Sequence, residues 1–289
     1  MDALSKNRSC VSYGSNALTE GLEHLQGLIL EDGRNGTIQC PHNQCCFGIW
    51  DLNQGQLQAK VQEYIENDDP LELLHEGQLS KLWQGTFGQQ PVAIKAFPPL
   101  CHQQFASEWA MYSLPLMNHE NVGRLVTAGY GGPSEERCGL LVLTLCPLGS
   151  LRNFLSHHIC SWEISIRLGS SLASGLAFLH EEKREEGLHK PGVAHRDLSS
   201  QNVLVREDRT CVITDFGFAM TLPLRHEQSR KGPAEAIVHK VGAQRYVAPE
   251  ILDENLNLQD VGSALRQADV YSMALVLWEI LMRCSALFP

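Results

Sequence analysis

Alternating hydrophobic and polar residues predict strands at several places in the C-terminal three quarters of the chain. Residues 91–97 (PVAIKAF) alternate and are rich in β-branched side chains, which is typical of a strand. Residues 140–145 form a nearly continuous apolar run and predict a buried strand. Two short strands are expected at 203–205 and 211–213, joined by a turn at 207–208.

Helical periodicity marks three longer stretches between and after these strands. Residues 102–113 are long-chained and periodic, and they predict a helix. Residues 162–182 place apolar side chains at nearly helical spacing, which predicts a second helix. Residues 265–282 are apolar on almost every side, so we expect this third helix to be buried. The region from about residue 71 to 289 therefore mixes strands and helices.

The first part of the chain has a different pattern. Residues 1–62 are rich in Gly and Asn and contain short strand-like runs such as 46–50. Residues 63–70 are acidic and end in a proline, which indicates a linker. The pattern thus predicts an N-terminal block, a linker at 63–70 and a larger domain at 71–289.

The composition excludes several classes of protein. The 289 residues carry 23 basic and 33 acidic side chains, a formal net charge of −10. With 43% hydrophobic and 19% charged residues, we expect a globular chain with roughly two domains. The acidic balance argues against nucleic-acid binding. Apolar runs are shorter than the roughly 20 residues that span a bilayer, and the first residues lack a signal-peptide core. A cytoplasmic location is expected if the sequence is complete.

The ten cysteines fall into two groups. Cys10, Cys40, Cys45 and Cys46 lie early and close together, which is typical of part of a disulfide framework. A reducing compartment would keep these four thiols unpaired, and we expect the N-terminal block to be disordered there. The others are scattered and predict small buried side chains: Cys101, Cys138, Cys146, Cys160, Cys211 and Cys284.

Four motifs occur in a fixed order in the larger domain. Residues 92–95 (VAIK) lie on the first predicted strand, and residues 195–202 match H-R-D-L-x-x-x-N. Asp-Phe-Gly at 215–217 and Ala-Pro-Glu at 248–250 follow. Each could arise by chance, but the four in this order are the signature set of protein kinases. The set predicts an α+β, two-lobed protein-kinase fold.

The residue types in these motifs suit phosphoryl transfer, in which catalysis is mostly positioning and charge neutralisation. Lys95 would place a positive charge on the α- and β-phosphates of ATP, and Glu108 is its expected carboxylate partner. The alternative for Glu108 is a solvated position on a helix face. Asp197 would accept the proton of the substrate hydroxyl. Asn202 and Asp215 offer oxygen atoms suited to Mg²⁺.

Three further residues near these motifs are expected to have structural roles. Phe216 would pack inward and help to set the position of Asp215. His195 is expected to be a packed histidine rather than an acid or a base. Asp269, on the third predicted helix, would anchor the catalytic loop, which is the segment of the H-R-D-L-x-x-x-N motif at 195–202.

The nucleotide-binding loop departs from the expected glycine-rich pattern. The motif G-x-G-x-x-G should precede the strand of Lys95, but residues 75–80 (HEGQLS) contain only Gly77, at the middle glycine position. His75 and Ser80 occupy the other two positions, where side chains obstruct close approach of the backbone to phosphates. We expect a looser cofactor-binding loop at Gly77, with an ordinary hairpin glycine as the alternative.

Longer stretches of the chain resemble the type II receptors of the transforming-growth-factor-β superfamily, at residues 45–50, 91–99, 105–108, 114–121, 190–197, 242–250 and 278–284. The resemblance implies a serine/threonine kinase domain preceded by a partial, cysteine-containing three-finger ectodomain of small β-structure. It also implies ATP with Mg²⁺ or Mn²⁺ as cofactors, and a membrane receptor that binds a dimeric hormone. Its expected substrate is a type I receptor kinase that signals through Smad proteins.

The chain departs from this family pattern in four ways. A membrane span between the two blocks is missing, and the first block has too few cysteines for the family's disulfide set. The sequence stops before the helices that complete the large lobe, which would leave Glu250 without its arginine and the apolar face of 265–282 uncovered. Ser199 stands where many serine/threonine kinases have a phosphate-contacting lysine. Ala243 replaces a threonine, which predicts weaker alignment of Asp197.

Three functions are compatible with these observations. The intact set of catalytic residues favours an active or residually active serine/threonine kinase. The truncated large lobe, the single glycine and Ala243 favour a non-catalytic receptor paralogue that engages or titrates type I receptors or Smad-pathway partners. A hormone-binding decoy is disfavoured by the incomplete cysteine framework.

Overall fold

The computed structural model describes residues 8–9, 39–40, 71–77, 79–131, 137–222, 243–253 and 260–288. In the N-terminal block, strands β1 (Arg8–Ser9) and β2 (Gln39–Cys40) pair antiparallel. The rest of that block, most of its predicted disulfide framework and the predicted linker at 63–70 lie outside the described residues.

A five-stranded antiparallel sheet forms the first lobe of the larger domain, in the order β3-β4-β5-β7-β6. Its strands are β3 (Glu72–Glu76), β4 (Lys81–Phe87), β5 (Gln90–Phe97), β6 (Leu125–Gly131) and β7 (Cys138–Thr144). The predicted strands at 91–97 and 140–145 are therefore the central pair β5 and β7. Their register sets Lys95 opposite Leu141, in the middle of the sheet.

Both faces of the central strands are buried, which explains the unbroken apolar run of β7. Leu141 and Leu143 belong to the same core cluster as Phe105 of helix α3 (His102–Tyr112). Leu140 and Val142, which point the opposite way along the strand, pack in a second cluster with Trp83. Burial of side chains of this size contributes about 1.5–3 kcal/mol each. The first cluster therefore holds α3 against the sheet, and the second packs the opposite face.

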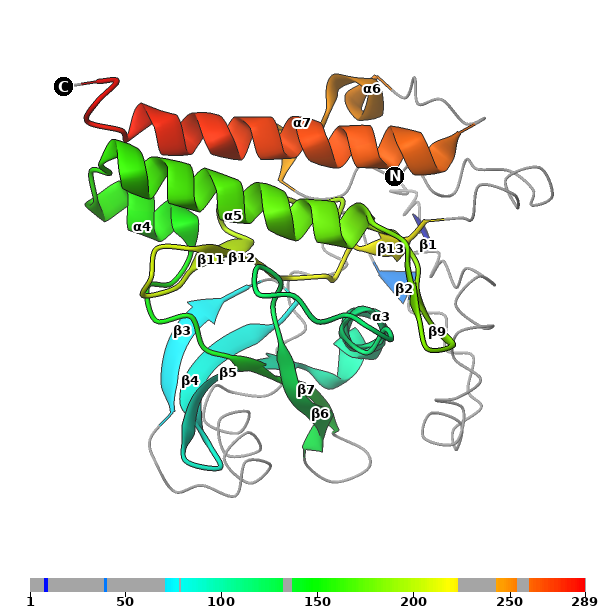
Figure 1. The fold of residues 1–289 in the computed structure, drawn as a ribbon. Coiled ribbons are helices and arrows are strands. Elements are labelled where there is room, and N and C mark those ends of the chain that lie inside the picture. Colours follow the sequence, from blue (N-terminus) through cyan, green and yellow to red (C-terminus); the bar gives the residue numbers. More distant parts are fainter. Residues whose placement is uncertain are drawn as a thin grey trace, which may run out of the picture.

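The second lobe is mainly helical (Figure 1). Its longer helices are α4 (Leu151–His157), α5 (Trp162–His180) and α7 (Val261–Met282). Short elements connect them: β8 (Lys183–Glu185), β9 (Leu188–Lys190), β10 (Val193–Ala194), β11 (Val203–Val205), β12 (Cys211–Ile213), β13 (Met220–Thr221), the 3₁₀ turn η4 (Gln244–Tyr246) and α6 (Pro249–Leu252). The predicted strands at 203–205 and 211–213 pair as expected.

Helix α5 lies at the centre of this lobe. The Ser161 side chain accepts a hydrogen bond from the backbone N–H of Ile164 and thereby caps its first turn. One face of α5 carries the buried residues Leu168, Leu172, Leu176 and Leu179. Gly175 lets the helix approach the chain at Asn121, because a Cβ there would lie 2.5 Å from the Asn121 carbonyl oxygen.

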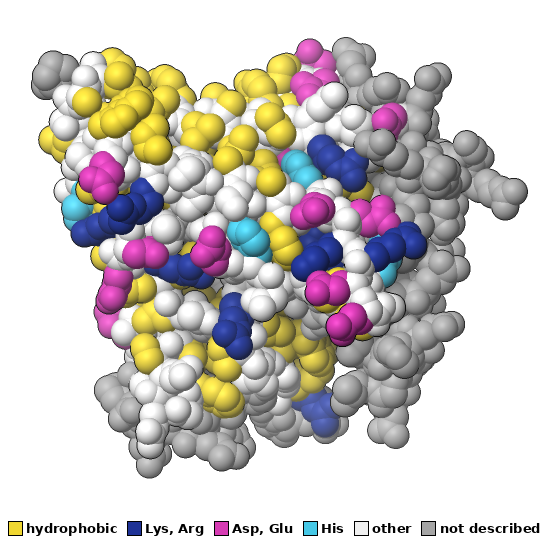
Figure 2. All heavy atoms as spheres, in the orientation of Figure 1, with side chains coloured by type: hydrophobic (Ala, Val, Ile, Leu, Met, Phe, Trp, Pro, Cys, Tyr) yellow, Lys and Arg dark blue, Asp and Glu magenta, His cyan; other side chains and the backbone are white. Residues whose placement is uncertain are grey.

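Helix α7 begins earlier than predicted, and only one of its faces is buried. It begins at Val261 rather than at Leu265, because the Asp260 side chain caps the backbone N–H of Ser263. The inner residues, such as Ile280, are buried, but Val270 is 47% and Trp278 is 60% exposed. Figure 2 shows hydrophobic side chains gathered along the edge of the molecule that α7 forms. Among the described residues, packing against α5, β10 and η4 buries one face of α7. The exposed side chains agree with the expectation that part of the apolar face of 265–282 is uncovered.

The six cysteines of the larger domain are buried free thiols, as the scattered pattern predicts: Cys101, Cys138, Cys146, Cys160, Cys211 and Cys284. Among the described residues, helices are too short or too polar to cross a membrane.

Candidate active site

The loop between β10 and β11 carries Asp197 and is anchored by Asp269 of α7. The buried Asp269 carboxylate accepts hydrogen bonds from the backbone N–H groups of His195 and Arg196, both at 2.8 Å. Arg196 has a φ of 66°, a left-handed conformation that is costly for a residue with a side chain. The two bonds from Asp269 hold this strained turn, which is the anchoring role expected from the sequence.

His195 is fully buried and packs as the sequence predicts. Its Nδ1 accepts the backbone N–H of Asp197 at 3.3 Å, so the ring proton is on Nε2, which donates to the Thr214 carbonyl oxygen at 3.0 Å. The ring also lies 5.4 Å, centroid to centroid, from that of Phe216. Phe216 itself is fully buried, so it points inward as expected.

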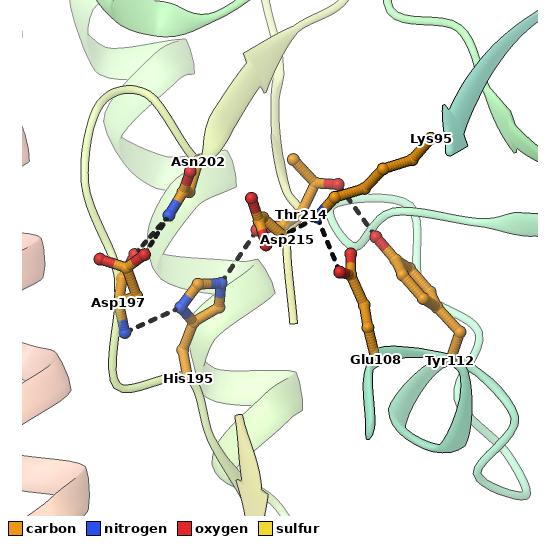
Figure 3. Close-up of polar contacts among 8 residues, drawn as sticks. All are labelled: Lys95, Glu108, Tyr112, His195, Asp197, Asn202, Thr214 and Asp215. Carbon is orange, nitrogen blue, oxygen red and sulfur yellow. Dashed lines mark hydrogen bonds and ion pairs between the residues drawn. The ribbon is translucent and has the colours of Figure 1, made fainter. Parts of the chain in front are cut away.

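Three hydrogen bonds orient the segment around Asp197. Figure 3 shows the two that come from Asn202. Asn202 Nδ2 donates to Asp197 Oδ2 at 2.9 Å and to the Asp197 carbonyl oxygen at 2.8 Å. The backbone N–H of Ala243 donates to Asp197 Oδ1 at 2.9 Å. Burial raises the pKa of Asp197, and these bonds to the carboxylate oppose the rise.

The hydrogen bond from Ala243 tests the expectation that the side chain of Asp197 is less well aligned. That expectation rested on the loss of a threonine hydroxyl at position 243. The contact in the structure comes from the backbone, which an alanine supplies as well as a threonine does. The substitution therefore leaves the carboxylate of Asp197 with a donor at this position.

Lys95, Glu108 and Asp215 form a charged cluster between the two lobes (Figure 3). Lys95 Nζ lies 2.7 Å from Glu108 Oε2 and 3.0 Å from Asp215 Oδ1. The Glu108 side chain is 1% exposed, so the alternative of a solvated helix position is excluded. The cluster thus ties β5, α3 and the segment after β12 together.

The cluster shifts the pKa of each member. Burial lowers the pKa of Lys95, but the two carboxylates more than offset this and hold it above its usual range. Burial raises the pKa of Glu108 to about 7, against the pull of the Lys95 ammonium. Burial would also raise the pKa of Asp215, yet Lys95 outweighs it and the pKa falls. Asp215 is therefore an ionised carboxylate at neutral pH.

Gly77 lies apart from this cluster, in the turn between β3 and β4. Its backbone N–H donates to the Ser80 carbonyl oxygen at 2.9 Å and closes the turn. A Cβ at Gly77 would lie 3.1 Å from the same oxygen, which is a tight contact. The turn lies between β3 and β4, where a nucleotide-binding loop is expected. A glycine at this position is also usual in an ordinary hairpin, so both interpretations of Gly77 remain.

Sequence reasoning missed a hydroxyl pair beside the cluster. Tyr112 Oη and Thr214 Oγ1 share a hydrogen bond of 3.0 Å (Figure 3). Tyr112 follows Glu108 by one helical turn, and Thr214 immediately precedes Asp215. These positions, next to two candidate site residues, are the sequence feature that could have predicted the contact.

Comparison with known proteins agrees with this geometry. The sequence profile of the family described as protein tyrosine and serine/threonine kinase matches residues 70–289. The chain is 50% identical over 223 residues to the anti-Müllerian hormone type-2 receptor of Rattus norvegicus, which covers 75% of this chain and 40% of the receptor. It is 37% identical over 223 residues to activin receptor type-2A of Rattus norvegicus, covering 75% and 42%. It is 39% identical over 208 residues to TGF-beta receptor type-2 of Mus musculus, covering 72% and 36%. The chain spans about two fifths of the length of these curated relatives.

Proposed function

Because the chain belongs to the protein tyrosine and serine/threonine kinase family and has receptor serine/threonine kinases as homologues, we propose that it transfers the γ-phosphate of ATP to a serine or threonine of another protein. The kinase fold and the resemblance to type II receptors, both predicted from the sequence, are confirmed. The observation that carries the proposal is the assembled cluster of Lys95, Glu108 and Asp215 beside an oriented Asp197.

Each candidate residue has a role that its contacts support. Lys95, held by Glu108, would bind the α- and β-phosphates of ATP. Asp197 would accept the proton of the substrate hydroxyl, because its two carboxylate oxygens are fixed by Asn202 and Ala243. Gly77 would let the turn between β3 and β4 approach the nucleotide.

Mg²⁺ or Mn²⁺ fits the donor set of Asp215 and Asn202. Asp215 uses one carboxylate oxygen on Lys95, and its side chain is 40% exposed. The amide nitrogen of Asn202 donates hydrogen bonds to Asp197, so the amide oxygen is the atom that could bind a cation. Both are hard oxygen donors of the kind that these ions prefer. When bound, the ion would neutralise charge on the phosphates.

The relatives suggest the wider setting. We propose a kinase domain at 71–289, a linker at 63–70 and a partial ectodomain-like block at 1–62. The substrate would be a type I receptor kinase of the same superfamily, in signalling of the anti-Müllerian hormone or BMP type through Smad proteins. Use of ATP implies a cytoplasmic setting for this domain, and hormone binding would belong to a complete ectodomain.

A second candidate is a catalytically weak or inactive receptor paralogue that acts by binding proteins of the same pathway. The exposed apolar side chains of α7, with Val270 at 47% and Trp278 at 60%, favour this alternative, because such surfaces mark interaction sites. The single glycine of the turn at Gly77 points the same way.

Phosphoryl transfer to a purified type I receptor kinase fragment separates the two. The full chain is incubated with Mg²⁺ and ATP, and phosphoserine and phosphothreonine are measured by mass spectrometry. We expect transfer by the wild type and by Lys183→Ala, whose side chain is 46% exposed on the β8–β9 hairpin, and loss in Lys95→Ala and Asp197→Ala. Absence of phosphate transfer by all four proteins would reject the kinase function and favour the binding function.

A further inference from the structure

The hydroxyl pair of Tyr112 and Thr214 joins helix α3 to the segment that carries Asp215. The two oxygens lie 3.0 Å apart, and Tyr112 is only 6% exposed (Figure 3). Burial raises the pKa of Tyr112, so its hydroxyl keeps its proton at neutral pH. A hydrogen bond in such surroundings is costly to leave unmade, because water cannot easily replace the missing partner.

Thr214 is a junction of three parts of the site. Its side chain bonds to Tyr112 of α3. Its carbonyl oxygen accepts from His195 Nε2 at 3.0 Å, and its backbone N–H donates to the Asn202 carbonyl oxygen at 2.9 Å. Thr214 therefore links α3 to the catalytic loop, one residue away from Asp215.

Tyr112 shares a helix face with Glu108. Its ring also packs edge-on against Phe216, with centroids 4.8 Å apart and planes at 74°. A shift of α3 that separates Glu108 from Lys95 would thus also pull Tyr112 away from Thr214 and Phe216. The ion pair and the hydroxyl pair form or break together because both depend on the same helix.

Gly123 has no side chain, and the hydroxyl pair occupies the space next to it. A Cβ at this position would lie 3.3 Å from both Tyr112 Oη and Thr214 Oγ1. The backbone N–H of Gly123 donates to the Ile213 carbonyl oxygen at 2.7 Å, which fixes it beside the end of β12. A side chain here would push the two hydroxyl groups without removing either.

We propose that the Tyr112–Thr214 hydroxyl pair is a latch that positions Asp215 for its cation and couples that position to the placement of α3. In this proposal Tyr112 and Thr214 are positioning residues, since they act through the Asp215 segment by their contacts with each other, Phe216, His195 and Asn202. The inference rests on the proposed function, because it takes Asp215 as a ligand of Mg²⁺.

A double-mutant cycle on Mg²⁺-dependent nucleotide binding tests the latch. Calorimetry gives the dissociation constant of ADP with and without Mg²⁺ for the wild type, Tyr112→Phe, Thr214→Val and the double variant. Each single change keeps the size of the side chain and removes one hydroxyl. We expect each to reduce the Mg²⁺-dependent tightening by about three- to tenfold, and the double variant to lose no more than one single variant does. Unchanged tightening in the single variants, or losses that multiply in the double variant, would overturn the latch.

Matched controls separate positioning from general damage. Tyr130→Phe and Thr210→Val make the same chemical changes on β6 and in the β11–β12 turn, and both should keep the wild-type tightening. Thr214→Ser restores the hydroxyl and should recover it, whereas Gly123→Ala should reproduce the loss with both hydroxyl groups present. Failure of Thr214→Ser to exceed Thr214→Val would overturn the latch.

Hydrogen exchange of the nucleotide-free chain keeps this inference distinct from the kinase activity. Loss of either hydroxyl should speed exchange both in α3 and in residues 211–222, with no further gain in the double variant. This result would uphold the link between α3 and the Asp215 segment even if the wild type transfers no phosphate. Phosphate transfer by the wild type with faster exchange in only one of the two segments would overturn the latch and leave the kinase intact.

Discussion

The charged cluster and the turn at Gly77, which would bind the same nucleotide under the proposed function, differ in how completely they are built. Lys95, Glu108 and Asp215 are joined by contacts of 2.7 and 3.0 Å from three separate elements. The turn between β3 and β4 has only Gly77 in the position where three glycines are usual, and its backbone bond is internal to the turn. The contacts within the charged cluster are thus complete, while the turn has fewer glycines than the proposed nucleotide-binding loop would need.

The difference separates catalysis from affinity. Groups that contact the reacting atoms stabilise the transition state and therefore set kcat. A loop that binds the whole nucleotide stabilises the bound substrate and the transition state about equally, so it changes KM and not kcat. We therefore expect the reduced turn to raise the KM for ATP and to leave kcat nearly intact. Four predictions can break or sharpen this contrast.

The largest effect should come from Asp197→Asn. The amide keeps the size of the side chain but cannot accept the proton of the substrate hydroxyl, so kcat should fall about 10³-fold. The KM for ATP should stay within about twofold of the wild type, since Asp197 does not hold the nucleotide. Steady-state rates across an ATP titration measure both constants. A change confined to KM would show that Asp197 binds rather than catalyses.

Lys95→Met should cost about 10²-fold in phosphoryl transfer, because the charge on the phosphates is lost. It also leaves the buried Glu108 carboxylate without its nearest cation, which should lower the free energy of unfolding by about 3–5 kcal/mol. The double variant with Glu108→Gln should recover most of this stability and none of the activity. Urea denaturation and transfer assays check the two effects, and recovery of activity in the double variant would contradict the role of Lys95.

The pH dependence should follow Glu108, whose pKa burial raises to about 7. The groups that face it are Lys95, Asp215, Tyr112 and the backbone N–H of Phe216. Below pH 7 the carboxyl gains a proton and releases Lys95, so activity should fall about tenfold from pH 8 to pH 6. Stability moves the other way: the native state binds this proton between the ordinary pKa of 4.5 and 7, so this group's contribution to the free energy of unfolding rises as pH falls through 7.

Glu108→Gln provides the control for this prediction. The glutamine does not titrate, so the decline in activity between pH 8 and pH 6 should flatten, at a lower level overall. A decline as steep as that of the wild type would assign the titration to another group.

Much of this arrangement follows from local sequence, and the rest depends on long-range contacts. The strands around Lys95 and the helix of Glu108 were predicted because periodicity reports which face each residue buries. The apolar pattern of α7 alone predicted burial without saying which neighbours are present, and the exposed outer face was expected only from the family resemblance. The bonds from Ala243 to Asp197 and from Tyr112 to Thr214 join residues far apart in the chain, so motif spacing gave no direct sign of them.

The smallest effect should come from restoring glycines in the turn. His75→Gly with Ser80→Gly removes the two side chains that obstruct approach to the phosphates, and the KM for ATP should fall a few-fold, by about 0.5–1 kcal/mol of binding. Gly77→Ala should raise KM by a similar factor, since its Cβ would lie 3.1 Å from the Ser80 carbonyl oxygen. ATP titrations of the three proteins measure these shifts, and an unchanged KM in both variants would make Gly77 an ordinary hairpin glycine.

The value of kcat at saturating ATP reports whether the catalytic cluster is complete. The most direct measurement is the initial rate of phosphate transfer to a type I receptor kinase fragment, across an ATP titration with Mg²⁺, for the wild type and the His75→Gly, Ser80→Gly variant. We predict equal kcat values within about twofold and a lower KM in the variant. Absence of phosphate transfer by both proteins at every ATP concentration would contradict the claim that the catalytic cluster is complete, and a much higher kcat in the variant would contradict the claim that the turn affects only KM.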